Sequence, residues 1–184
     1  LGEFKAGHVL VEGGSSRGTS SGGDVVLRSG GAGLMGAGNV SIVSGSSGPE
    51  GNGGSIAVAA GTSQSANGYA GDVHISGGVH DAGETPELGN AGNVKVTAGS
   101  AAFGYGGNLS LASGSGSLRG GGVVIETAQS PSSDSGSLML QTGSSVAGST
   151  GAVVVTSGAG AVAGNVTLSA GASKAANGAT SSVL

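Results

Sequence analysis

The amino-acid sequence predicts an all-β fold, a parallel β-solenoid of about eleven repeats of roughly 15 to 16 residues. Three observations lead to this prediction. A short motif recurs along nearly the whole chain, the aliphatic residues within each copy alternate with other residues, and glycine-rich stretches of variable length separate the copies. The composition agrees, because a chain of 184 residues with 43 glycines, 9% charged residues and no cysteine or tryptophan is unlike an ordinary globular domain.

The repeated motif is a glycine, a small or polar residue, two aliphatic residues separated by one other residue, a further variable residue, and a small residue followed by glycine. The eleven copies read GHVLVEGG, GDVVLRSG, GNVSIVSG, GSIAVAAG, GDVHISGG, GNVKVTAG, GNLSLASG, GGVVIETA, GSLMLQTG, GAVVVTSG and GNVTLSAG. They occupy residues 7–14, 23–30, 38–45, 54–61, 71–78, 92–99, 107–114, 121–128, 136–143, 151–158 and 164–171. Length varies only between the motifs, which indicates structured segments joined by tolerant loops.

The alternating aliphatic residues predict a strand of about five residues in each motif, with one buried face. Glycines on either side supply the corners, and no helix is expected. The predicted core consists of Val25, Leu27, Ile42, Ile56, Val58, Val73, Ile75, Val94, Val96, Leu109, Leu111, Val123, Ile125, Leu138, Leu140, Val153, Val155, Val166 and Leu168.

One repeat cannot fold alone, because burying two aliphatic side chains gains roughly 3 to 6 kcal/mol, whereas ordering some fifteen residues costs at least about 1 kcal/mol each. The prediction therefore requires stacked neighbours. Either one or two repeats per coil satisfy the pattern. We expect a single repeat domain over residues 1–184, with repeats from about 6 to 171 and the start of a further, incomplete repeat at 172–184.

The residues between and beside the aliphatic pairs are predicted to point outward. Three asparagines there open N-glycosylation sequons and are candidate acceptors: Asn39, Asn108 and Asn165. The repeat consensus itself produces this motif wherever the next outward residue is serine or threonine. Five outward positions are apolar and are candidates for lateral contact with another chain: Leu10, Val26, Val124, Met139 and Val154.

The sequence gives no pattern for catalysis, for a cofactor or for a metal site. Its acidic and histidine residues are scattered, except in the longest loop, where His80, Asp81, Glu84 and Glu87 gather; we interpret that loop as a solvated insertion. The net charge of −4 has no basic patch, which disfavours nucleic acid as a partner. No apolar run approaches the roughly 20 residues of a membrane span, so no membrane association is predicted.

Repeats of the type SGGDVVLRSG and AGNVSIVSG resemble the Gly/Ser/Val-rich short-repeat β-solenoid arrays of secreted fibre and surface-appendage proteins of algae and other microbes. The resemblance extends from Ala6 to about Gly171. It implies an extracellular or cell-surface scaffold able to carry glycans, and it assigns no functional residue.

These observations predict an extracellular structural protein that is not an enzyme. The chain is expected to form a rod or a filament subunit that assembles with itself by end-to-end stacking, lateral packing or both. The alternative is a secreted binding module, such as an adhesin-like stalk or an ice-binding face. A regular column of threonine or serine would favour the alternative, but the outward pairs, such as Val26/Arg28 and Lys95/Thr97, form no such array.

Overall fold

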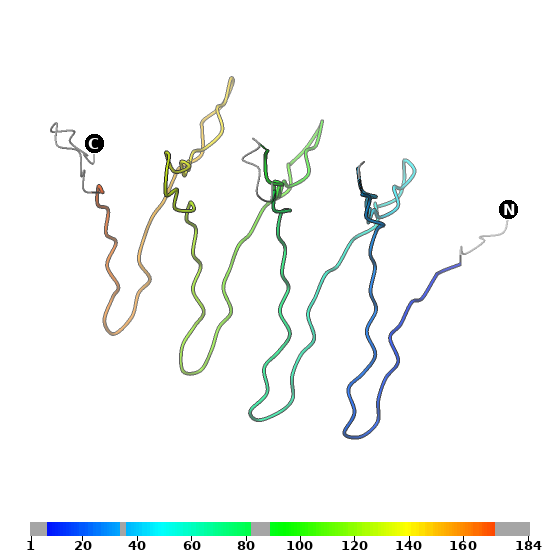
Figure 1. Cartoon of the computed structure of the whole chain (residues 1–184). Coiled ribbons are helices and arrows are strands. Elements are labelled where there is room, and N and C mark those ends of the chain that lie inside the picture. Colours follow the sequence, from blue (N-terminus) through cyan, green and yellow to red (C-terminus); the bar gives the residue numbers. More distant parts are fainter. Residues whose placement is uncertain (1–6, 34–35, 82–88, 172–184) are drawn as a thin grey trace. The chain divides into compact units, whose positions relative to one another are not determined.

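The computed structural model describes residues 7–33, 36–81 and 89–171, which include all eleven motifs. Within these ranges the chain contains no helix and no strand. Figure 1 shows a tube of extended segments joined by turns and loops. The prediction of an all-β, parallel β-solenoid is therefore wrong for this structure. Neither of the two windings is present in the described part, because the motif segments form no strand ladder with one another.

The predicted core is also wrong, because no described residue is buried. The nineteen aliphatic residues expected inside have side chains that are 51 to 79% exposed. The solvent-accessible surface of the chain is 18456 Å². A compact monomer of the same mass would expose only about 7,600 Å². The apolar surface thus remains in contact with solvent and contributes little to the stability of a single chain.

The physical reason is the small apolar content of each repeat. Two aliphatic residues in some sixteen offset only a fraction of the backbone entropy that ordering the repeat would cost, and the many glycines raise that cost further. Stacking was expected to supply the difference. In the structure no stacked strand covers the aliphatic residues of a motif segment. The free energy gained by burial therefore does not offset the entropy cost of ordering the repeat, and the segment stays extended.

Order in the chain comes instead from a repeated hydrogen bond, which we call the glycine clasp. In each clasp the N–H of the first glycine of one motif donates to the carbonyl oxygen of the last glycine of the motif before it. Seven loops are closed in this way, at N···O distances of 2.7 to 3.0 Å: Gly14–Gly23, Gly30–Gly38, Gly45–Gly54, Gly61–Gly71, Gly78–Gly92, Gly99–Gly107 and Gly114–Gly121. The glycines that flank these seven loops therefore join the two ends of each loop by a hydrogen bond.

The small residue before the acceptor glycine is the part of the repeat that is least exposed to solvent. Among the described residues seven are partly buried, and six of these directly precede an acceptor glycine: Gly13, Ser29, Ser44, Ala60, Gly77 and Ala98. At Ser44 the hydroxyl also donates to the carbonyl oxygen of Gly54 across the clasp, at 2.9 Å. This packing explains why the repeat has only glycine, serine or alanine at these clasped positions.

The two glycines of a clasp differ in the space around them. A Cβ added at the acceptor Gly78 would meet no atom within 4 Å, whereas one added at the donor Gly92 would lie 2.8 Å from the Gly78 nitrogen. We therefore expect Gly92→Ala to break its clasp and Gly78→Ala to preserve it. One net hydrogen bond corresponds to roughly 2- to 10-fold protection of the residue 92 amide. Amide exchange measured by NMR checks this, and equal protection in both variants would contradict the geometry.

Other turns within the loops are local. In the loop after residue 45, Gly51 donates to the carbonyl of Gly48 at 3.3 Å, with Pro49 at the turn position that its fixed φ favours. Gly18 and Gly104 have φ values of 134° and 114°. Such angles favour glycine, since they strain residues that carry a Cβ.

The chain divides into two units, Leu1–Val96 and Thr97–Leu184. The first contains five of the clasps and the second contains two, the last of them at Gly121. The three loops after residue 128, at 129–135, 144–150 and 159–163, have no clasp in the structure. The single repeat domain predicted from the sequence stays a prediction. Its expected incomplete repeat at 172–184 lies outside the described residues.

Candidate interaction site

The most apolar stretches of the described chain are five runs of three consecutive large aliphatic or methionine residues, which we call the apolar triplets. They are Val9-Leu10-Val11, Val25-Val26-Leu27, Val123-Val124-Ile125, Leu138-Met139-Leu140 and Val153-Val154-Val155. Because successive side chains of an extended backbone point to opposite sides, each triplet is apolar on both sides. The remaining motif segments have a polar residue or Ala57 between their two aliphatic residues, so none of them contains such a triplet.

The five residues predicted to make lateral contacts are the central residues of these triplets. In four of the five triplets the central residue is the most exposed member; Val124, for example, is 79% exposed between Val123 at 56% and Ile125 at 58%. Leu10 is the exception, being less exposed than both of its neighbours. The structure therefore presents all five side chains to solvent.

The backbone of the three consecutive triplets between residues 123 and 155 is unpaired as well. None of their peptide groups takes part in a hydrogen bond in the structure. These triplets also lie in the stretch that has no glycine clasp. Residues 123–155 thus combine two-sided apolar segments with exposed peptide groups, a combination that favours association with another chain.

Sequence reasoning missed a second group of exposed apolar residues, at the loops. Tyr69, Phe103, Tyr105 and Leu118 are 97 to 101% exposed, more than any predicted core residue. They were overlooked because they lie outside the motif. A detectable signal is that each of them is a large apolar side chain in a loop that consists mainly of small residues.

The candidate glycosylation residues occupy one register. Asn39, Asn108 and Asn165 each follow the first glycine of a motif, and each is exposed. For Asn39 and Asn108 that preceding glycine is the donor of a clasp. The hydroxyl residues two positions later, Ser41, Ser110 and Thr167, are exposed too. All three sequons are therefore open to solvent.

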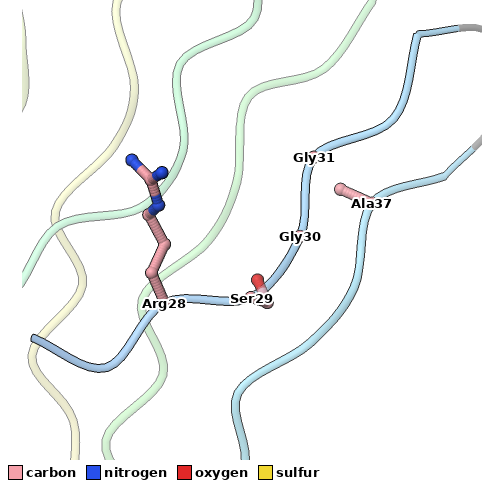
Figure 2. A pocket seen from close by; sticks show the side chains of 5 residues that line it. All are labelled: Arg28, Ser29, Gly30, Gly31 and Ala37. Atoms are coloured by element: carbon pink, nitrogen blue, oxygen red, sulfur yellow. The ribbon is translucent and has the colours of Figure 1, made fainter.

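One open hollow of about 490 Å³ lies at the second clasp, lined by Arg28, Ser29, Gly30, Gly31 and Ala37. Figure 2 shows the Ala37 side chain pointing toward the Gly30–Gly31 backbone, while the Arg28 side chain extends away from it. The hollow offers one cation and one hydroxyl. It lacks the paired acid and base, or the nucleophile with an adjacent base, that catalysis requires.

The charged loop is described only in part. His80 and Asp81 lie in the structure, whereas Glu84 and Glu87 fall outside the described residues. The imidazole of His80 lies against Gly89, where it occupies the position that a side chain would take. Among the residues that the structure covers, no group of three or more histidine, cysteine or acidic side chains is placed to hold a metal ion.

In the described ranges no helix is long and apolar enough to cross a membrane. Comparison of the chain with protein-family models, with curated proteins and with solved structures finds no match.

Proposed function

We propose that this protein is an extracellular structural protein whose copies associate laterally through their apolar triplets. The observation that carries the proposal is the exposure of the triplets: a chain with 36% hydrophobic residues buries none of those described. Contiguous exposed apolar segments of this kind are typical of contact surfaces.

The energetics favour contact between copies. Fully burying one aliphatic side chain gains roughly 1.5 to 3 kcal/mol. Covering the central residues of three triplets in each of two chains buries six such side chains and gains roughly 9 to 18 kcal/mol, which is comparable to the association cost of about 4 to 15 kcal/mol. The peptide groups of the triplets add hydrogen bonds if they pair with those of another chain. Within one chain the peptide groups of the three triplets between residues 123 and 155 make no hydrogen bond in the structure.

Lateral packing is the part of the expected assembly that this structure supports. End-to-end stacking depended on solenoid coils with open strand edges, and the described residues form no such coils. The five central residues Leu10, Val26, Val124, Met139 and Val154 need no coil, because each lies on an extended segment that another copy can approach directly. We therefore place the contact on these segments.

The extracellular location rests on a sequence observation, namely that the repeats resemble those of secreted fibre and surface-appendage proteins. This resemblance is consistent with a scaffold outside the cell that is assembled from many copies of one chain. The protein's partner in this proposal is a second copy of itself.

Light scattering on the full chain over a series of concentrations tests the proposal. We expect the mean mass to rise above the 16.7 kDa of one chain as concentration increases. A constant monomer mass at high concentration would overturn the proposed assembly, since apolar segments that associate must respond to mass action.

The association is expected to depend on net charge. The chain carries −4 at pH 7 and has an isoelectric point of about 5.1. As the pH falls from 7 toward 5.1, repulsion between like-charged copies decreases, so we expect association at lower concentration. The same light-scattering series at pH 7 and at pH 5.1 measures this effect, and weaker association at pH 5.1 would show that charge repulsion is not the opposing force.

A further inference from the structure

We propose that Asn39, Asn108 and Asn165 are N-glycosylated by transfer from a lipid-linked pyrophosphoryl oligosaccharide. Each of the three sequons lies on an exposed extended segment, with both its asparagine and its hydroxyl residue open to solvent. Accessibility of the acceptor amide and of the hydroxyl is the structural requirement for this modification. The inference depends on the extracellular role proposed above, since the chain must meet the donor on a secretory route.

The transfer balances as a simple displacement. The amide nitrogen of the asparagine forms a bond to C1 of the first sugar, while the bond between C1 and the pyrophosphate oxygen breaks. The amide gives up one proton to a base of the transferase, and the lipid pyrophosphate leaves with the electron pair of the broken bond. No oxidant or further co-reactant is required.

The register of the repeat places the glycans away from the aliphatic pairs. Side chains alternate along an extended segment, so Asn39 and Ser41 point to the side opposite Val40 and Ile42. The same relation holds for the other two sequon segments. None of these three segments is an apolar triplet, because the hydroxyl residue occupies the central position. The proposed acceptor residues and the proposed contact residues therefore lie on different motif segments.

The chain contains its own matched control. Asn93 lies at the same register as the three acceptors, follows the clasp donor Gly92, and is equally exposed, but Lys95 stands where the hydroxyl residue is needed. Asn93 is therefore expected to remain unmodified. Lys95→Ser should convert it into a fourth acceptor without altering the clasp, because Lys95 is exposed and has no contact that the clasp requires.

The experiment incubates the full chain, made in bacteria, with a purified oligosaccharyltransferase and its lipid-linked oligosaccharide, and maps the products by peptide mass spectrometry. We expect glycans on Asn39, Asn108 and Asn165, none on Asn93, and a fourth on Asn93 in Lys95→Ser. Ser41→Ala, Ser110→Ala and Thr167→Ala should each remove one glycan. The same full chain, directed into the secretory route of a eukaryotic host, should show the same pattern.

Absence of glycan from all three asparagines in the purified reaction, while a short acceptor peptide is modified, would overturn the inference. Modification in the purified reaction but not in the eukaryotic host would overturn the inference that these asparagines are glycosylated on the secretory route. The outcome is separate from the assembly test: a glycosylated chain that stays monomeric would refute the proposed assembly and leave the glycosylation intact.

Discussion

Replacing Val124, Met139 and Val154 together by aspartate is expected to weaken self-association by at least about 1,000-fold. The reason is the loss of apolar area at the centres of the three consecutive triplets, at roughly 1.5 kcal/mol for each residue. Each new carboxylate would also have to be desolvated at the contact. Sedimentation velocity over a concentration series measures the change. Because no described residue is buried within the chain, the variant cannot lose stability through a disrupted core.

The matched control places the same three charges in the same register of other motif segments. Ser41→Asp, Ser110→Asp and Thr167→Asp change the net charge by the same amount but remove no large apolar residue. We expect this control to weaken association by less than about tenfold, through charge repulsion alone. Equal losses in the two variants would mean that charge, and not the triplets, determines association.

A dilute solution of the chain is expected to be cut by a trypsin-like protease at the motif segments as fast as at the loops. Arg28 and Lys95 lie in motif segments, Arg17 and Arg119 lie in clasped loops, and all four are exposed. Each site should be cut within about threefold of its rate in a short peptide of the same sequence, because local opening costs almost nothing where no core exists.

A packed solenoid would give a very different result. Cleavage within a folded segment requires opening, which for an ordinary domain slows cutting by a factor of about 1,000 or more. The loop sites serve as the internal control, since they would be cut quickly in either case. Slow cutting at Arg28 and Lys95 with rapid cutting at Arg17 and Arg119 would contradict the extended structure described here.

The sequence predicted the position of every repeated unit but not the state that the units adopt. The eleven motifs coincide with extended segments, and loops fall between them as the variable spacing indicated. The prediction that the alternating aliphatic residues form a buried face was wrong. Alternating aliphatic residues such as Val94 and Val96 show which residues share a side of the backbone, but they do not show whether anything covers that side.

The estimated energies already indicate that one repeat cannot fold alone, but a sequence pattern does not show whether neighbouring repeats stabilise it. The gain from two aliphatic residues was smaller than the cost of ordering one repeat, and only the structure shows whether neighbouring repeats make up the difference. The glycine clasp was equally hard to anticipate. The sequence predicts only corners at the glycines before and after each loop, whereas the pair Gly78 and Gly92 is joined by a hydrogen bond across the longest loop.

The candidate contact residues could be selected from sequence because their signal is local. Val124, Met139 and Val154 stand out as apolar residues at positions where other motifs have serine, threonine, lysine or histidine. Their assembly into a contact surface between copies remains a proposal. The loop residues Tyr69 and Phe103 were missed because no repeat pattern includes them.

The central claim is that the apolar triplets are exposed in a single chain and become covered only between copies. Hydrogen exchange with mass spectrometry over residues 121–158 tests it most directly, at a concentration where the chain is monomeric and at one where it is assembled. We predict exchange near the rate of an unstructured peptide in the monomer, and slowing by at least about 100-fold at the triplets on assembly, with loop 144–150 still exchanging rapidly. Slow exchange at the triplets in the monomer, or unchanged rapid exchange in the assembled protein, would contradict the claim.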